Sequence, residues 1–489
     1  MKVCLLNDSF PPVIDGVVNV VMNYANYLQR GCGAEVLVGT PRYPDTDYSA
    51  YPYPVVPYSS FNTASVTNGY RAGNPFREKA VSEMAHFQPD IIHTHCPASS
   101  TVIARLLREE TDAPVIFTYH TKYDIDIRRA VKSELLAEEG IRAMIANIEA
   151  CDDVWVVSRG AGESLTELGF TGSWHVMNNG VDFEKGRVSD EKVREATAGF
   201  DLPEDVPLLL YVGRLMNYKN LPLTLQALKM LKDEGMDFRM VLIGKGPDGD
   251  SLRRMAAELG LYQNENEPDR CIFTGPVYDR EVLRAWNTRA DLFVFPSTFD
   301  TNGLVVREAA ACGLASVLVR GSCAAEGITD GRNGFLIDET PEALAAALKT
   351  LCADRNALRD AGLHAMNEIY ASWETCVGEA YERYQYILEE KAAGRLPQRK
   401  REISDYLLEV TARSMVHRDR LRSVRNELLR DMRDTASGMM ENFEEAGDSL
   451  SKQVLKLSDA ADEMERMSDR FWENMAEKLR IQLEELRKM

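Results

Sequence analysis

Residues 292–309, LFVFPSTFDTNGLVVREA, contain the pattern that decides the fold. The first four residues are apolar and run into a Pro-Ser pair, as in a buried β-strand that stops at a turn. The Asn302-Gly303 pair is a second turn signal, and it precedes a segment typical of a helix. A strand, a polar turn and a helix form the repeating unit of a parallel sheet covered by helices.

The same unit recurs on both sides of this segment. Apolar, β-branched runs occupy residues 3–6, 35–38, 90–93, 115–117 and 154–157, and then residues 208–212, 240–243, 271–273, 292–295 and 315–319. Helix-period segments such as 222–233 and 281–290 lie between them. This alternation predicts two successive doubly wound α/β domains, because the pattern starts afresh near residue 208. The polar stretch 182–205 is the predicted linker.

We predict four parts along the chain. They are a first domain over residues 1–185, a second over 186–372, a helix over 373–392 that closes the second domain, and a helical extension over 393–489. In the extension, apolar residues from Leu421 to Leu486 step by three or four, which is the spacing of an apolar stripe on one helix face. Such a stripe suits a homo-oligomer, a helical hairpin or a membrane surface, and these three alternatives stay open.

Composition excludes several classes of protein. The net charge of −19 over 489 residues disfavours nucleic acid as a partner, since that binding depends on basic side chains. The start of the chain is too polar for a signal peptide and no 18-residue apolar span occurs, so we expect a cytoplasmic protein. Residues 391–433 are basic, which keeps peripheral contact at the inner membrane face as an alternative. The nine scattered cysteines are expected to be free, mostly buried thiols.

The second domain has the groups that a nucleotide sugar requires. A diphosphate needs cations or backbone amides, and a ribose diol needs a carboxylate. Arg214 and Lys219 follow the strand 208–212, at the edge where open α/β sheets bind ligands. The Asn302-Gly303 turn opens a helix whose free N–H groups and dipole suit a phosphate, and Glu308 lies in that helix.

These segments resemble the family 4 glycosyltransferases, which are retaining enzymes of the GT-B fold with two Rossmann-like domains facing a cleft. The family motif is Glu, seven residues and Glu, with a Gly three residues after the first acid. This chain matches it as Asp300, Gly303 and Glu308, with Asp in place of the first Glu. The alternative is that Asp300 only caps its own loop.

The resemblance also implies a role for each site residue. The donor would be held by Gly16, Arg214, Lys219, Asn302, Gly303, Leu304 and Glu308. Arg214 and Lys219 would bind the phosphates, Glu308 the ribose, and Asp300 with the backbone of 302–304 the transferred sugar. Gly16, in the loop after the first strand, would let the diphosphate approach. His120 would lie near the reacting sugar, so His120 and Asp300 are the candidate catalytic residues.

The first domain supplies the acceptor side. The strings His-Thr-His at 93–95 and Thr-Tyr-His-Thr-Lys-Tyr at 118–123 resemble those of the bacterial diacylglycerol glucosyltransferases. This resemblance implies a lipid acceptor, with His95 and Tyr123 on the acceptor side. Six tyrosines between Tyr43 and Tyr70 either form a rim for the acceptor or pack against one another in a surface loop.

We therefore expect a retaining, metal-independent hexosyltransferase with no cofactor, acting from a nucleotide sugar such as UDP-glucose on diacylglycerol or another glycolipid precursor. Three histidines at strand ends could resemble a metal site, but no cysteine or carboxylate completes a ligand spacing. A mannosyl- or galactosyltransferase with a soluble or polysaccharide acceptor is the alternative within the family. A nucleotide-sugar epimerase and a non-catalytic sugar-nucleotide sensor are the alternatives from other classes.

Overall fold

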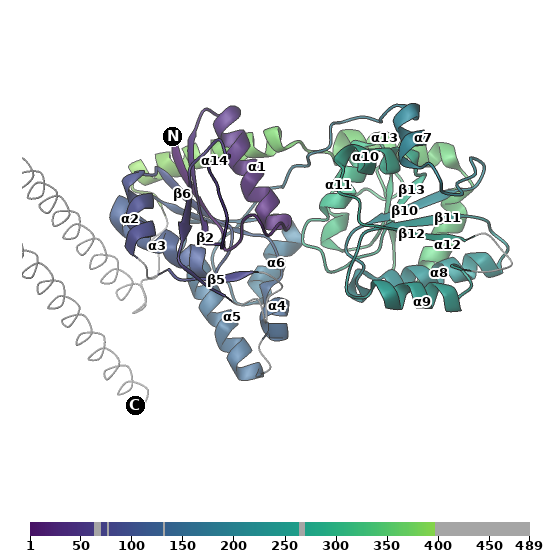
Figure 1. The fold of residues 1–489 in the computed structure, drawn as a ribbon, viewed down its shortest axis with the longest axis horizontal. Helices are drawn as coiled ribbons and strands as arrows, with labels where there is room; N and C mark the ends of the chain where they lie inside the picture. The colour runs from purple at the N-terminus through teal and green to yellow at the C-terminus, as the bar shows by residue number, and fades with distance from the viewer. Residues whose placement is uncertain (63–69, 76–77, 131–132, 264–268, 397–489) are drawn as a thin grey trace, which may run out of the picture. The chain divides into compact units, whose positions relative to one another are not determined.

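The computed structural model describes residues 1–62, 70–75, 78–130, 133–263 and 269–396 (Figure 1). Within them the chain forms two parallel sheets with helices, which confirms the predicted pair of Rossmann-like halves. Residues 1–181 are called the first half and residues 182–372 the second half, and both belong to one compact unit. The predicted extension lies outside the described residues from residue 397 onward.

The first half is built on a seven-stranded parallel sheet in the order β3-β2-β1-β6-β7-β8-β9. Its strands are β1 (Lys2–Leu6), β2 (Glu35–Pro41), β3 (Val55–Tyr58), β6 (Ile91–Thr94), β7 (Val115–Tyr119), β8 (Asp153–Val156) and β9 (His175–Val176). A short antiparallel ribbon pairs β4 (Ser60–Asn62) with β5 (Arg71–Gly73). The five strands predicted for this half are all present, with ends that differ from the prediction by at most three residues.

The helices of the first half are α1 (Gly16–Arg30), α2 (Glu78–His86), α3 (Ser99–Thr111), α4 (Tyr123–Ala130), α5 (Glu134–Glu149) and α6 (Arg159–Glu167). Helix α1 shows why such segments become helices. The Asp15 carboxylate caps its first turn by accepting from the Val18 amide at 2.8 Å. Val18, Val21 and Leu28 then lie on one buried face, at intervals of three and seven residues.

The second half repeats this architecture on a six-stranded sheet in the order β12-β11-β10-β13-β14-β15. Its strands are β10 (Leu208–Val212), β11 (Arg239–Ile243), β12 (Cys271–Gly275), β13 (Leu292–Phe295), β14 (Ser316–Val319) and β15 (Phe335–Ile337). Its helical elements are α7 (Asp190–Ala196), η1 (Asn217–Lys219), α8 (Leu221–Asp233), α9 (Gly249–Glu258), α10 (Arg280–Arg289), α11 (Leu304–Ala311), η2 (Cys323–Ala325), α12 (Pro341–Cys352) and α13 (Arg355–Glu368).

Each sheet has a point at which the strand order reverses. In the second sheet the chain passes from β10 outward to β12 and then returns to place β13 on the other side of β10. In the first sheet β6 lies beside β1 in the same way. Loops that follow the two strands at such a point diverge to opposite faces of the sheet, which makes room for a ligand at the carboxyl edge. The loops after β10, β13, β1 and β6 are therefore the expected positions of ligand-binding residues.

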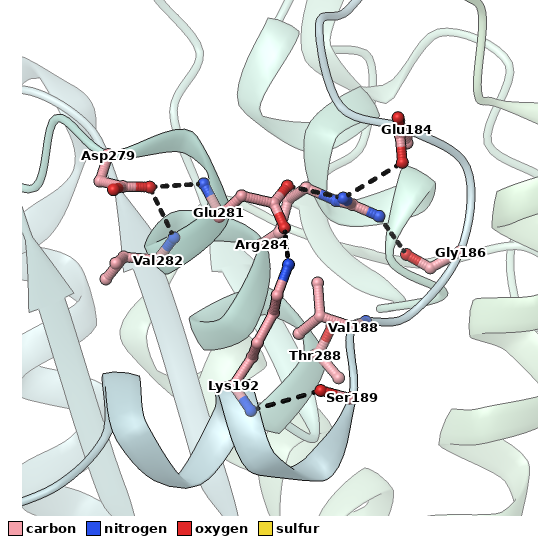
Figure 2. A network of polar contacts seen from close by, with 10 residues as sticks. All are labelled: Glu184, Gly186, Val188, Ser189, Lys192, Asp279, Glu281, Val282, Arg284 and Thr288. Carbon is pink, nitrogen blue, oxygen red and sulfur yellow. Dashed lines mark hydrogen bonds and ion pairs between the residues drawn. The ribbon is translucent and has the colours of Figure 1, made fainter.

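The predicted linker at 182–205 is a structured part of the second half. It contains α7, whose Lys192 Nζ donates to the Glu281 carboxylate of α10 at 2.7 Å (Figure 2). Arg284 of α10 donates to the Gly186 carbonyl at 3.2 Å and contacts Glu281 at 2.7 Å. The exposed Lys192–Glu281 ion pair contributes about 0.2–1 kcal/mol, and together with the Arg284–Gly186 hydrogen bond it joins the segment to α10.

The predicted closing helix, α14 (Trp373–Ala392), exists, but its expected place was wrong. It was expected to complete the second half, whereas its apolar stripe packs into the core of the first half. Val377, Ala380 and Tyr384 lie among residues of β1 and α1, and Figure 1 draws α14 beside α1. The apolar periodicity of a helix predicts that one face is buried, but it does not say against which sheet.

Two further expectations concern single residue types and membrane spans. All nine cysteines are free thiols, and six of them are buried, as predicted. Among the described residues, no helix is both long enough and apolar enough to cross a membrane.

Candidate active site

The loop after β10 carries the two predicted phosphate ligands. Arg214 is exposed, and its carbonyl accepts from the Tyr211 hydroxyl at 3.0 Å. Lys219 ends the short helix η1 and is only 8 % exposed. Its ammonium lies 5.9 Å from the ring centroids of Phe295 and Phe299, which are close enough for cation–π attraction. The two cations thus differ, because one faces solvent and the other is held among aromatic rings.

Lys219 and Asp300 form an ion pair, although the sequence assigns them to different parts of the donor. The Lys219 Nζ donates to one carboxylate oxygen of Asp300, and the Ser297 hydroxyl donates to the other at 2.5 Å. Both oxygens of Asp300 therefore have partners within the second half. This arrangement agrees with a positioning role for Asp300, and it leaves its predicted contact with the sugar a proposal.

Residues 300–303, called the donor loop, lead into the N-terminus of α11. Gly303 adopts a left-handed conformation with φ of 62°, which a residue with a side chain rarely adopts. A Cβ atom at Gly303 would also lie 2.8 Å from the Cβ of Ala324. No side chain caps the first amides of α11, which begins at Leu304. Such an end attracts an anion through its N–H groups and dipole.

Glu308 forms an ion pair with Arg280, a residue that no sequence motif indicates. Its carboxylate accepts from Arg280 at 2.6 Å, and the Arg280 guanidinium stacks 4.5 Å from the centroid of the Phe183 ring. Burial raises the pKa of Glu308 despite the neighbouring Arg280. Its position in the chain could have indicated this pair. Arg280 begins the helix that follows β12, so it lies near the same carboxyl edge of the sheet as Glu308.

Gly16 is the first residue of α1, and a Cβ atom there would have no neighbour within 4 Å. The space beside it is therefore open to a ligand. Asp15, which caps α1, also accepts from the Tyr70 hydroxyl at 2.8 Å. Among the other tyrosines of the predicted rim, Tyr43, Tyr53 and Tyr58 are buried, and the ring of Tyr51 contacts those of Tyr48 and Tyr53. The interpretation as tyrosines that pack against one another holds for Tyr48, Tyr51 and Tyr53.

The first half brings three histidines together at the ends of β6 and β7. His95 Nδ1 and His120 Nε2 are 2.9 Å apart and share one hydrogen bond. His93 contacts the Tyr384 hydroxyl at 2.6 Å and the Thr118 hydroxyl at 2.7 Å. Burial lowers the pKa of all three imidazoles, that of His120 to about 3. They are therefore neutral at physiological pH.

Tyr123 and the Asp8 carboxylate, which no sequence motif indicates, complete this side. The Tyr123 hydroxyl donates to the His95 carbonyl at 3.2 Å. Asp8, at the end of β1, accepts from the Ser100 amide at 2.8 Å and from the Tyr58 hydroxyl at 3.0 Å. Burial raises the pKa of Asp8. With several donors around it, Asp8 fixes the start of α3 beside the histidines.

Hydrogen bonds between the halves join the two groups of residues. The Thr301 hydroxyl donates to the His120 carbonyl, and the Asn302 amide donates to the Val157 carbonyl. The donor loop of the second half therefore contacts the segment that holds His120 in the first half. The roles predicted for His120 and for the donor loop stay predictions, and the two segments are neighbours in the structure.

Comparisons with known proteins match both halves to glycosyltransferase families. The family described as Glycosyltransferase Family 4 matches residues 14–185, and the family Glycosyl transferases group 1 matches residues 193–366. The chain is 29% identical to sulfoquinovosyl transferase SQD2 of Arabidopsis thaliana over 377 residues, covering 73% of this chain and 67% of that one. It is 25% identical to alpha-monoglucosyldiacylglycerol synthase of Streptococcus pneumoniae, covering 64% of this chain and 70% of that one.

The fold has solved relatives as well. The crystal structure of Anabaena HepE in complex with UDP superposes with a TM-score of 0.61 at 18% identity, covering 79% of this chain and all of that one. At this identity the likeness shows the fold, which is GT-B. From the two matched families and this fold, we conclude that the chain belongs to the family 4 glycosyltransferases and is a glycosyltransferase.

Proposed function

We propose that this glycosyltransferase moves glucose from UDP-glucose to diacylglycerol, with retention of the anomeric configuration. The observation that carries the proposal is the contact between the donor loop and the His120 segment, because it joins residues suited to a nucleotide sugar to residues suited to an alcohol. Support for the donor comes from the UDP bound to HepE. Support for the acceptor comes from the diacylglycerol in the name of the Streptococcus pneumoniae relative.

On the donor side, Arg214 and Lys219 would neutralise the departing diphosphate. An ammonium has three N–H donors, so Lys219 can hold Asp300 and a phosphate oxygen at the same time. The amides at the start of α11 would add fixed dipoles, which is the role that preorganised donors play in stabilising developing charge. These groups can supply the neutralisation that a metal ion supplies elsewhere, and we propose that no metal or cofactor is required.

In the proposed reaction the acceptor hydroxyl attacks the anomeric carbon on the face from which the diphosphate leaves. The bond from the sugar to the diphosphate oxygen breaks, a bond to the acceptor oxygen forms, and the acceptor proton passes to the leaving diphosphate. No enzyme nucleophile is needed. His120, neutral and hydrogen-bonded to His95, would orient the sugar or the acceptor by a hydrogen bond.

The decisive experiment offers UDP-glucose, UDP-galactose and GDP-mannose, each with diacylglycerol in mixed micelles and with soluble sugars. Mass spectrometry should detect a lipid 162 Da heavier than diacylglycerol, about the mass of one hexose residue, with UDP-glucose. If product forms only with GDP-mannose or only with UDP-galactose, that nucleotide sugar is the donor and UDP-glucose is not. If product forms only with soluble sugars, the acceptor is not a lipid. Interconversion of donor sugars without an acceptor would identify an epimerase, and nucleotide binding without turnover would identify a sensor.

A further inference from the structure

A carboxylate from the second half occupies the N-terminus of a helix in the first half. Both oxygens of Glu326, the residue after η2, accept from backbone amides of α6, from Arg159 at 2.7 Å and from Gly160 at 2.6 Å. The third amide, of Ala161, bonds to the Ser158 hydroxyl at 3.0 Å. The first turn of α6 is thus capped by three hydrogen bonds. Glu326 accepts two of them, although it lies 166 positions from Gly160 in the chain.

Charge favours this contact. The amides at a helix N-terminus have no partner within the helix, and the helix dipole places partial positive charge there. A carboxylate that accepts two such amides makes charge-assisted hydrogen bonds, which are stronger than neutral ones. Because both of these hydrogen bonds from α6 come from backbone amides, the contact depends on the position of the helix and not on the identity of its side chains.

Close packing connects Glu326 to the donor loop. A Cβ atom at Gly160 would lie 2.6 Å from the Sγ of Cys323, and a Cβ atom at Gly303 would lie 2.8 Å from the Cβ of Ala324. The short helix η2 is therefore pressed against α6 on one side and against the donor loop on the other. A shift of α6 relative to Glu326 would move η2, and η2 has no free space before it meets Gly303.

The same movement would break the two hydrogen bonds that hold the donor loop from the first half. Thr301 and Asn302 donate to carbonyls of His120 and Val157, and Val157 immediately precedes the cap of α6. The donor loop is thus held by η2 from within its own half and by the ends of β7 and β8 from the other. Two of these supports adjoin α6, because η2 packs on Gly160 and Val157 precedes the Ser158 cap.

We infer that Glu326 is a positioning residue: by capping α6 across the two halves it fixes the donor loop against His120 in the arrangement that transfers the sugar. It contacts neither substrate. The inference rests on the proposed sugar transfer, but the cap itself can be measured without any substrate. Turnover should depend on Glu326, whereas the affinity for UDP, whose expected ligands lie in the second half and at Gly16, should not.

The first test is independent of the substrates. Hydrogen exchange of the peptide that contains Arg159 and Gly160 is compared between the full-length protein and its Glu326→Ala variant. We expect these amides to exchange at least tenfold faster in the variant. An unchanged exchange rate would show that Glu326 does not protect α6 and would overturn the inference, whatever the protein transfers.

The second test uses turnover. Glu326→Gln places an NH2 group opposite a backbone N–H and should lower kcat about tenfold while the dissociation constant of UDP changes less than about threefold. Glu163→Gln, on the exposed surface of α6, is the matched control and should keep the wild-type kcat. Wild-type kcat in Glu326→Gln, or a loss of UDP affinity as large as the loss of turnover, would contradict a positioning role.

A third variant tests the packing and provides a rescue. Gly160→Ala should lower kcat as Glu326→Gln does, because its methyl group meets Cys323. Adding Cys323→Ala removes the sulfur and should restore most of the lost turnover. If the double variant is folded but does not recover turnover, η2 does not connect the α6 contact to the donor loop. If the wild-type protein transfers no sugar and binds no UDP, the proposed function fails, and the exchange experiment still decides the role of Glu326.

Discussion

The donor side and the acceptor side of the candidate site differ in how their polar groups are charged. On the donor side the side chains occur as opposite charges in contact, Lys219 with Asp300 and Arg280 with Glu308. On the acceptor side the buried imidazoles, such as His120, are neutral and bonded to one another or to hydroxyls. The cations of these pairs have further N–H donors for a ligand that brings negative charge, and neutral groups suit an uncharged alcohol. This difference fits the two substrates that we propose.

The largest expected effect follows from removing a positive charge on the donor side. Lys219→Met keeps an unbranched apolar stem and removes the ammonium group, so the leaving diphosphate loses a cation and Asp300 loses its partner. We expect kcat/KM to fall about 1,000-fold, or about 4 kcal/mol. Initial rates of UDP release measure it. Lys229→Met, on the exposed face of α8, is the control. A fall of less than tenfold would place the phosphates elsewhere.

The next largest effect follows from removing an imidazole on the acceptor side. His120→Ala should lower kcat about 100-fold, because a hydrogen-bonding group beside the reacting atoms is lost. The affinity for UDP should not change, since the carbonyl of residue 120 still accepts from Thr301. Titration calorimetry with UDP and initial rates separate the two quantities. His364→Ala, exposed on α13, is the control, and equal losses of affinity and turnover would move His120 to the donor side.

Asp300→Asn tests whether Asp300 positions Lys219 or contacts the sugar. If Asp300 positions Lys219, the variant should lose UDP affinity together with turnover, and we expect kcat/KM to fall about 30-fold. If Asp300 contacts only the sugar, turnover should fall while the affinity for UDP stays constant. Unchanged turnover and affinity would show that Asp300 is only a cap of its own loop.

The neutral histidines predict a dependence of stability on pH. Burial holds the pKa of His120 at about 3 in the folded state, below its ordinary value near 6.5 in the unfolded chain. The unfolded state therefore binds the proton first, so the stabilising contribution is complete above pH 6.5 and is lost as the pH falls toward 3. From pH 7 to pH 5 the loss should be about 2 kcal/mol for this residue.

Urea unfolding of the wild-type protein and of His120→Gln at both pH values measures this loss. The variant should lose about 2 kcal/mol less between pH 7 and pH 5, because glutamine does not titrate. Equal losses in the two proteins would mean that His120 is protonated in the folded state and that the acceptor side is charged.

The smallest expected effect concerns ribose. Glu308→Gln should raise the dissociation constant of UDP about tenfold, which corresponds to about 1.4 kcal/mol. The wild-type protein should prefer UDP to 2′-deoxy-UDP, and the variant should lose most of this preference if the carboxylate binds the ribose hydroxyls. Glu281→Gln, in the neighbouring helix α10, is the control. A preference that survives in Glu308→Gln would assign the ribose to another group.

The sequence predicted the strands and the order of the motifs because both depend on local patterns. Apolar runs define β10 and β13, and turn residues define their ends, so Lys219 and Gly303 could be placed at one edge of one sheet. It did not predict contacts between distant segments. The Lys219–Asp300 pair, the Arg280–Glu308 pair and the cap of α6 by Glu326 all depend on how the helices and the two halves pack.

The structure also shows why the place of α14 was predicted wrongly. Its stripe, which includes Trp373 and Tyr384, predicts one buried face, and the shortest connection would bury it in the half that precedes it. The Tyr384 hydroxyl instead bonds to His93, and the Tyr384 ring stacks on Trp155 with centroids 5.3 Å apart. Neither partner can be identified from the helix alone.

The crossing of α14 has a consequence for synthesis on the ribosome. The first half emerges first, but its core lacks Val377, Ala380 and Tyr384 until the whole of the second half has been translated. At about 5–20 residues per second, β1 and α1 wait tens of seconds with an apolar face uncovered. The half that is made first is therefore the half that is completed last, and it is the one that needs protection from aggregation in the interval.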